Sequence, residues 1–178
     1  GYDARNFSLM AFGGAGPLHA CEVAQGMGIN NVIVPPSPGT LCSMGLLMAD
    51  VKFDIVRSRI LIAHTEATTI VAELYEAMMV EGCELLDKEG VLQGERLFEA
   101  EIECRYERQN YELPIPVTLP ITWESIKEMK RRFHEEHERT YGYRNEGLNI
   151  QMVNYRLHAI GEIQKPVLRK ERFVKDMQ

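Results

Sequence analysis

Three glycines, Gly13, Gly14 and Gly16, have the clearest potential for chemistry in this chain, because they follow an apolar run over residues 7–12. Glycine has no Cβ, so a ligand can approach its backbone closely, and it adopts positive φ angles readily. Pro17 comes next and suits the first position of a helix, where its missing N–H is not needed. The start of a helix presents unpaired N–H groups and the positive end of the helix dipole. The pattern therefore predicts a buried strand, a glycine turn and a helix that together can receive a phosphate or a nucleotide.

A purely structural role for these glycines is an open alternative, since glycines also permit tight packing where a strand meets a helix. Residues 13–20 contain no Lys, so the segment is not a P-loop, and it lacks the G-x-G-x-x-G spacing of dinucleotide-binding proteins. The residue pattern alone therefore does not choose between a nucleotide site and packing.

Three histidines occupy positions where an imidazole can act. His19 falls in the first turn of the predicted helix, where a neutral hydrogen-bonding role near a nucleotide or substrate is open to it. His134 and His137 are three residues apart on a later predicted helix, a spacing that can bring two imidazoles together around a metal. No third ligand is evident, so we predict no metal site, with His137 as an interior hydrogen-bonding residue and His134 on the surface. The sequence identifies no catalytic residue.

Composition and charge restrict the class of protein. The chain has 178 residues, 45% of them hydrophobic, and a net charge of -6, which argues against binding nucleic acid by neutralising phosphates. No apolar run approaches the ~18 residues of a membrane span. The four cysteines form no C-x-x-C pair, and we expect buried free thiols in a reducing, cytoplasmic protein. The chain opens directly into strand sequence, which predicts that it is part of a longer polypeptide.

The first third of the chain is predicted to be an α/β fragment. Strands over residues 7–12 and 32–34 flank a helix over residues 17–28, which favours a right-handed crossover and a parallel sheet. A proline-rich loop over residues 35–39 follows the second strand, and ligands gather beyond the strand ends of such sheets. A short apolar segment over residues 40–49 is predicted to be a buried helix.

The rest of the chain is predicted to pack helices on a small, mainly antiparallel sheet. Period-2 and period-3.6 patterns mark its elements, which are a strand over 51–62, a helix over 64–88, strands over 98–106 and 111–115, a helix over 123–141 and a strand over 149–161. In the last strand we expect Val153, Tyr155, Leu157 and Ala159 to face inward. Prolines at positions 114 and 116 predict that the strand containing them lies at a sheet edge. The expected domains are residues 1–63 and 64–163, with a loose tail over residues 164–178.

Several segments together resemble the hydantoinase A/5-oxoprolinase family, which includes N-methylhydantoinase, 5-oxoprolinase and related subunits of acetone carboxylases. The resemblance covers nearly the whole chain up to about Gly161, and its most specific segments are Gly1–Phe7, Ala11–Ala20, Val32–Gly39, Cys104–Leu113 and Phe133–Tyr143. It implies the end of an actin/hexokinase/Hsp70-type nucleotide-binding domain, followed by an α+β C-terminal domain. In such folds a late strand–Gly-Gly–helix motif contacts the adenosine of ATP.

The resemblance implies the C-terminal part of an ATP-dependent cyclic-amide hydrolase that activates the carbonyl oxygen by phosphorylation. Its cofactors would be ATP and Mg²⁺, and its partners the upstream part of the same polypeptide and a second subunit of the hydantoinase B type. The adenosine contact transfers to Gly13, Gly14, Ala15, Gly16 and His19. The family's early Asp-Gly-Gly-Thr-type phosphate loop has no counterpart in these 178 residues, so at most one wall of the ATP site is present and the chain is expected to be inactive alone.

Two further points qualify the resemblance. Arg108 stands where the family usually has Gly, which leaves the type of turn there open. A second hypothesis gives the part after His64 a role in assembly, as an interaction module of a hetero-oligomeric hydantoinase or acetone-carboxylase-type complex, with the glycine turn serving only packing.

Overall fold

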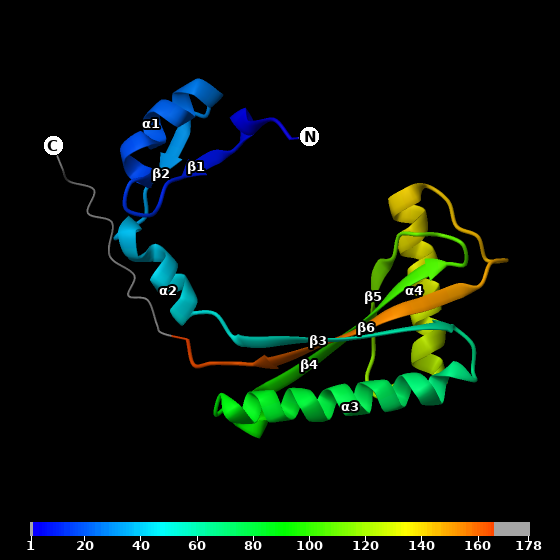
Figure 1. Ribbon diagram of the computed structural model, residues 1–178. Coiled ribbons are helices and arrows are strands. Elements are labelled where there is room, and N and C mark those ends of the chain that lie inside the picture. The colour runs from blue at the N-terminus through cyan, green and yellow to red at the C-terminus, as the bar shows by residue number, and fades with distance from the viewer. Residues whose placement is uncertain (1, 166–178) are drawn as a thin grey trace. The chain divides into compact units, whose positions relative to one another are not determined.

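The computed structural model describes residues 2–165 of the chain. Within these residues the contacts form two compact units, an N-terminal unit that extends to Ala49 and a sheet unit of residues 50–163 (Figure 1). The strand that follows Asp50 belongs to the sheet of the second unit, so the division lies before the predicted boundary at residue 63. The predicted domains of the longer protein stay a prediction, and the predicted tail lies beyond the described residues from residue 166 onward.

The N-terminal unit is built on a strand–helix–strand crossover. Strands β1 (Ser8–Met10) and β2 (Asn31–Ile33) pair in parallel, and helix α1 (Gly16–Met27) connects them. Gly28 ends α1 in the left-handed conformation, with a φ of 68°, as expected for a residue just beyond a helix. The 3-10 turn Pro38–Thr40 and helix α2 (Leu41–Leu47) follow β2. The predicted strand–helix–strand order and the parallel pairing are confirmed.

The predicted burial of this unit is wrong for the described chain. β1 has no fully buried residue, α2 has none either, and Leu18, Leu46 and Phe7 are exposed by 77%, 77% and 55%. The apolar patterns are real, but a two-stranded sheet with two helices has too few layers to cover both of its faces. The buried apolar residues of this unit are small, namely Ala11, Ala20 and Ala24.

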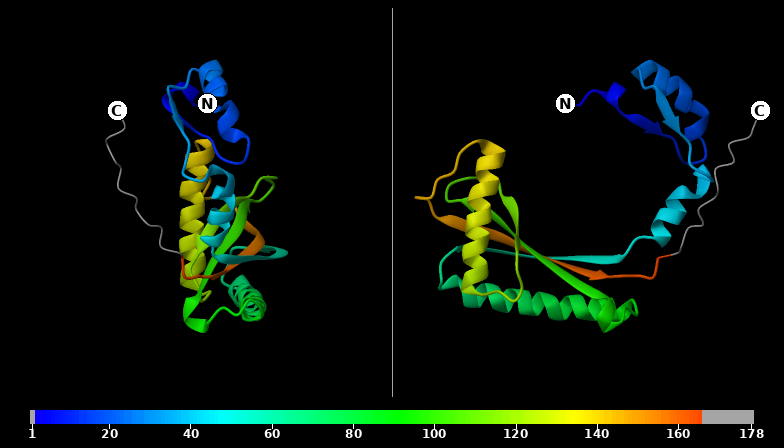
Figure 2. Two further views of the ribbon diagram at one scale, coloured as in Figure 1. Left: turned by 90° about the vertical axis from the view of Figure 1, so that its left-hand side faces the viewer. Right: turned by 180° about the vertical axis from the view of Figure 1, so that it is seen from behind.

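The sheet unit is a four-stranded antiparallel sheet with two helices, shown from further directions in Figure 2. The strand order is β3-β6-β4-β5, which places β5 at an edge as its prolines predicted. The elements are β3 (Val51–Ile62), α3 (Ala67–Lys88), β4 (Arg96–Tyr106), β5 (Leu113–Val117), α4 (Trp123–Tyr141) and β6 (Ile150–Gly161). The mixed α/β fold with a small antiparallel sheet is therefore confirmed.

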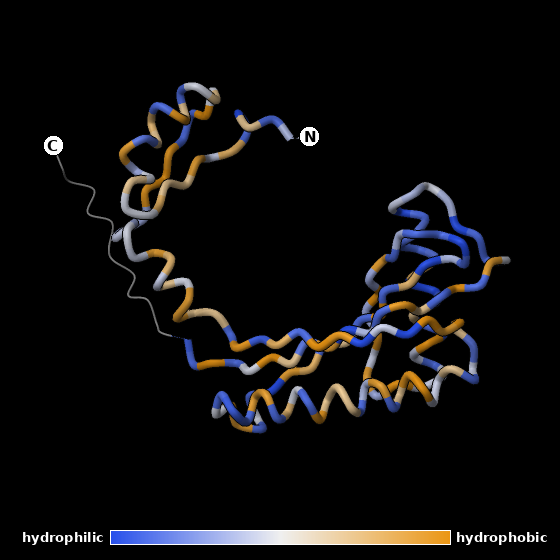
Figure 3. Tube along the Cα trace, in the orientation of Figure 1, coloured by the Kyte–Doolittle hydropathy of each residue, from blue (hydrophilic) through white to orange (hydrophobic). Residues whose placement is uncertain are grey.

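Both helices of this unit contribute to one hydrophobic core. Tyr75 and Met78 of α3 and Phe133 of α4 are buried in a single cluster with sheet residues such as Ile102 and Leu157. In Figure 3 hydrophobic residues recur along α3 and alternate with hydrophilic ones along the strands. Because the helices and one face of each strand share this core, the other face of the sheet carries the charged side chains.

A β-bulge changes the expected face of one residue in β6. Asn154 pairs with Glu103 of β4, but Met152 pairs with the next residue, Cys104, so Val153 is left over in the ladder. Met152 is fully buried while Val153 is only half-buried. The predicted inward position of Val153 is therefore wrong, whereas those of Tyr155, Leu157 and Ala159 are confirmed.

The four cysteines are free thiols, as predicted, but the expected burial holds for only one. Cys104 is buried in the sheet core, Cys83 is intermediate, and Cys21 and Cys42 are exposed. The two exposed thiols belong to α1 and α2 of the N-terminal unit, which lacks a covering layer among the described residues.

No helix within residues 2–165 combines the length and the apolar character needed to cross a bilayer.

Candidate functional site

The glycine turn joins β1 to α1 and is tied to the loop that follows β2. The Ala11 N–H donates to Ile33 O at 2.9 Å, which extends the parallel pairing beyond β1. The Gly13 N–H donates to Pro38 O at 2.8 Å, and Gly13 has a φ of 88°, where a Cβ would be strained. The two loops at the carboxyl ends of the parallel strands therefore lie together, as ligand-binding loops do in open α/β sheets.

Open space adjoins the glycines of this turn. A Cβ added to Gly13 or Gly14 would meet no described atom within 4 Å, and one added to Gly16 would approach only the Ala11 carbonyl carbon, at 4.0 Å. Tight packing within the described chain therefore does not explain Gly13 and Gly14. No side chain caps the start of α1, where Ala15 is the N-cap residue and Pro17 is the second residue of the helix.

A small pocket of about 210 Å³ lies beside the turn. Gly16 and His19 both line it, and His19 is exposed. Gly13, Gly14 and Ala15 are not among its lining residues; the other residues that line it are Leu9, Met10, Ala11, Phe12, Ala20 and Val23. The structure thus brings two of the five predicted site residues together at a pocket and places the other three on the turn before it.

The lining of this pocket selects the kind of ligand that can occupy it. It contains no Lys, Arg, Asp or Glu, so no charged side chain is present there to neutralise phosphate or to bind Mg²⁺. Apolar side chains from β1, from α1 and from the segment between them, including Phe12, form most of its wall. Such a surface suits the flat face of a neutral heterocycle, and the pocket is smaller than a complete nucleotide site requires.

The two histidines of α4 have separate hydrogen-bond partners and do not face a common centre. His137 is 1% exposed; its Nδ1 donates to Tyr143 O at 2.8 Å and its Nε2 lies 3.1 Å from Gln109 Nε2. The predicted interior hydrogen-bonding role of His137 is confirmed. His134 is half-buried, with Nδ1 2.6 Å from the Tyr106 hydroxyl, so its predicted surface position is only partly met. Within residues 2–165 no group of three or more His, Cys, Asp or Glu side chains is placed to hold a metal.

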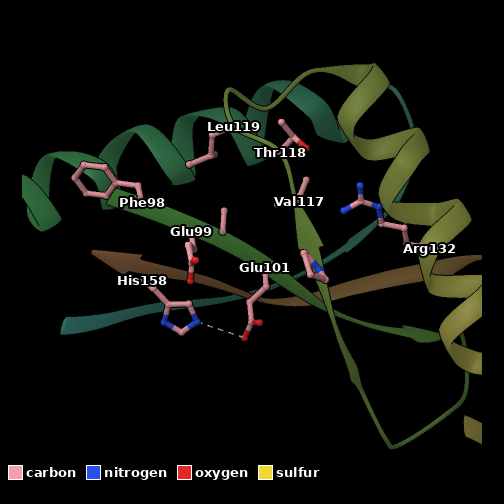
Figure 4. Close-up of a pocket in the computed structure, with 10 residues that line it drawn as sticks. Phe98, Glu99, Glu101, Val117, Thr118, Leu119, Arg132 and His158 are labelled. Carbon is pink, nitrogen blue, oxygen red and sulfur yellow. Dashed lines mark ion pairs between the residues drawn. The ribbon is translucent and has the colours of Figure 1, made fainter. Parts of the chain in front are cut away.

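The sheet unit holds a second, larger pocket that the sequence did not reveal. Its volume is about 570 Å³, and Glu99, Glu101, Arg132 and His158 are among its lining residues (Figure 4). His158 pairs with Asp54 through Nδ1, and its Nε2 lies 4.0 Å from Glu101. The alternating glutamates of β4 were recognisable as one face of a strand. The side chains that surround these glutamates could not be recognised from the sequence, because His158 and Asp54 come from strands distant in sequence.

An arginine organises the charges on this face of the sheet. Arg156 contacts Glu103 at 2.8 Å and Glu101 at 3.1 Å, and Asn154 donates to Glu103 at 2.6 Å. The hydrogen bond from Arg156 holds the pKa of Glu103 below its ordinary value, because it favours the charged carboxylate. These side chains are mutually satisfied, so the network stabilises the sheet face and leaves few groups for a ligand.

Comparison with known proteins agrees with the motif and the fold. The family model described as hydantoinase/oxoprolinase matches residues 1–55, the segment that contains the glycine turn. An uncharacterized protein of Methanocaldococcus jannaschii is 35% identical over 95% of this chain, and the caprolactamase subunit alpha of Pseudomonas jessenii is 23% identical over 93%. Through residues 1–55 the chain belongs to the hydantoinase/oxoprolinase family. It spans about a quarter of the length of these relatives, 24% in each case.

Two solved structures have the same fold as this chain. The nucleotide-free structure of acetone carboxylase, from work on ATP-dependent acetone carboxylation, aligns with 97% of this chain at a TM-score of 0.85 and 22% identity. The ATP-dependent caprolactamase of Pseudomonas jessenii aligns with the same share at a TM-score of 0.73 and 22% identity. Each alignment covers 26% of the solved chain. At this identity the likeness establishes the fold and not the reaction.

Proposed function

We propose that this chain is the C-terminal segment of an ATP-dependent cyclic-amide hydrolase of the N-methylhydantoinase/5-oxoprolinase type. The observation that carries the proposal is the glycine turn, which is open above Gly13 and Gly14 and adjoins an uncharged pocket. In this proposal the turn belongs to the end of an actin/hexokinase/Hsp70-type nucleotide-binding domain. The exposed apolar side chains of β1, α1 and α2 agree with a longer polypeptide that covers them.

The residues of the turn fit the adenosine part of ATP better than its phosphates. Backbone from Gly13 to Gly16 offers close approach, the apolar wall offers a surface for the purine, and His19 offers a hydrogen bond at the rim. ATP supplies phosphoryl-transfer chemistry, for which Mg²⁺ and charged side chains must surround the phosphates. Neither requirement is met by the lining of this pocket, so we assign the phosphate and Mg²⁺ contacts to the upstream part of the parent polypeptide.

Nucleotide titration of the parent protein with Gly14→Val tests this proposal. Gly14 has an ordinary φ and open space beside it, so valine leaves the turn unstrained but fills the space above the backbone. We expect the affinity for ATP and ADP to fall about tenfold or more, which corresponds to at least ~1.4 kcal/mol of binding free energy. Gly26→Val is the matched control, because Gly26 is also open and lies within α1.

Unchanged affinity in Gly14→Val would contradict the nucleotide role and favour the assembly function. A companion measurement uses the 178-residue chain by itself with ATP and a hydantoin or 5-oxoproline. We expect no turnover, because the chain lacks the phosphate-binding part of the site. Robust turnover would contradict the proposed division of the site.

Assembly remains a second candidate function for the sheet unit. The caprolactamase relative is named as a subunit alpha, which places at least one similar chain in a multi-subunit protein. A second subunit of the hydantoinase B type is the partner that we propose. Both functions can hold, since the glycine turn and the sheet belong to different units of the chain. The proposed location is the cytoplasm.

A further inference from the structure

Strand β4 has a strand neighbour on both sides along only part of its length. β6 pairs with all of Arg96–Tyr106, whereas β5 pairs only with Ala100–Cys104. Within the described residues, Arg96–Glu99 therefore has one edge without a strand partner. Unpaired N–H and C=O groups at a sheet edge are a template for another strand.

The pocket of Figure 4 lies along this unpaired edge. It opens where β4 and the chain after β5 separate, since Phe98–Glu101 lines one side and Pro116–Leu119 the other. Phe98 and Leu119 are partly buried and pack against the core, so they form an apolar wall. The pocket volume of about 570 Å³ is enough for several side chains of an added strand.

The charged side chains of the pocket favour a ligand with basic groups. Arg132 is paired with Glu128 at 2.9 Å, and Glu101 is paired with Arg156 at 3.1 Å. Glu99 is exposed and forms no ion pair within residues 2–165. The carboxylate of Glu99 is therefore the unpaired charge that a ligand in this pocket would meet.

The outer edge of β5 provides a contrast. Pro114 and Pro116 have no N–H, so this edge is poorly suited to accept a further strand. Arg96–Glu99 contains no proline. The sheet therefore blocks strand addition at β5 and permits it at the start of β4.

We propose that this pocket and the unpaired edge of Arg96–Glu99 bind an extended segment of a partner polypeptide in which apolar and basic residues alternate. The segment adds as a strand beside Arg96–Glu99, with its apolar residues against Phe98 and Leu119 and its basic residues beside Glu99. Successive residues of a strand point to opposite faces, which matches the apolar wall on one face and the carboxylate on the other. The proposal is independent of the ATP site.

Titration of the full chain with synthetic six-residue peptides tests the proposal. The probes are a fluorescent peptide of alternating Val and Lys, its Val–Glu counterpart, and the Val–Lys peptide with alternate backbone amides methylated. We expect the Val–Lys peptide to bind with a Kd below about 1 mM. The methylated and acidic peptides should bind about tenfold more weakly, because the first cannot pair with the edge and the second repels Glu99. Bound peptide should also slow hydrogen exchange of amides in residues 96–99.

Two variants locate the binding. Glu99→Lys should reverse the preference between the two charged peptides. Thr118→Trp should fill the pocket and abolish binding of both peptides. Glu84→Lys makes the same charge change at an exposed position of α3 and should leave binding unchanged. Equal binding of the methylated peptide, or no binding of the Val–Lys peptide, would overturn the proposal. Dimerisation of the chain that Glu99→Lys abolishes would also overturn it, in favour of a second copy as the occupant.

Discussion

Single residues in the turns of this protein hold conformations that their types disfavour. Arg108 has a φ of 75°, in the left-handed region that suits glycine. The resemblance to the hydantoinase A/5-oxoprolinase family leads us to expect Gly at this position. The backbone at Arg108 is therefore in a conformation that glycine adopts more readily than arginine does. Local sequence could mark this position as doubtful, but only the structure shows that the arginine adopts the backbone of the glycine.

We predict that Arg108→Gly stabilises the sheet unit. Glycine removes the steric cost of a positive φ, and part of this gain is offset by the greater freedom of glycine in the unfolded chain. The expected rise in the free energy of unfolding is about 0.5–1 kcal/mol, measured by urea denaturation. Arg108→Ala is the control, since it removes the same side chain but keeps a Cβ. An equal rise for alanine would show that the side chain, and not the backbone, is responsible.

His134 makes stability depend on pH. Burial lowers its pKa below the ordinary value of 6.5, because the charged form loses water, and its Nδ1 meets the Tyr106 hydroxyl. The unfolded chain therefore binds more protons than the folded chain as the pH falls below 6.5. The contribution of neutral His134 is present above that pH and is lost as the pH decreases through the folded pKa.

The corresponding prediction is that His134→Gln reduces the loss of stability between about pH 7 and pH 5. Glutamine keeps an acceptor for Tyr106 but does not titrate. Chemical denaturation at a series of pH values measures the slope, and His64→Gln at an exposed position is the control. The explanation fails if His134→Gln retains the full slope of the unaltered chain.

For the helices and strands, the sequence pattern predicted most of the elements, but it did not predict correctly which way every residue in them faces. Thr122 caps α4, with its Oγ1 accepting from Ser125 N at 3.1 Å, and Gly142 ends it at a φ of 81°. Such local signals can be recognised without the fold. The bulge at Val153 and the half-burial of His134 depend on neighbouring strands and on the α4 packing, which the sequence pattern did not contain.

Gly82 controls how closely α3 approaches the sheet. A Cβ there would lie 2.9 Å from Ala159 Cβ and 3.1 Å from Phe98 Cε1. We predict that Gly82→Ala lowers the free energy of unfolding by about 1–3 kcal/mol, because overpacking outweighs the better helix propensity of alanine. Circular dichroism during urea denaturation measures the loss. Gly26→Ala in α1, where a Cβ meets nothing within 4 Å, should cause none, and equal losses at both positions would exclude the packing explanation.

At the scale of the whole molecule, the sequence was most informative where its motif was local. The strand–glycine turn–helix of residues 8–27 is contiguous, so its shape followed from residue types alone. The open space beside Gly13 and Gly14 did not, because the same glycine pattern can also serve tight packing. The pocket of the sheet unit combines β4, β6, α4 and the end of β5, and its lining depends on a strand order that periodicity does not specify. The apolar N-terminal unit was expected to be buried, and the described residues supply no layer to bury it.

We propose above that the purine of ATP lies against the glycine turn of the parent protein. Photolabelling of the full-length parent with an azidoadenine analogue of ATP, followed by mass spectrometry of the labelled peptides, tests this contact directly. We predict a label within residues 9–23, which form the turn and line its pocket, and loss of that label when excess ATP competes. Labelling that ATP suppresses, but that falls only on peptides outside the turn and its pocket, would contradict a contact between the purine and the turn.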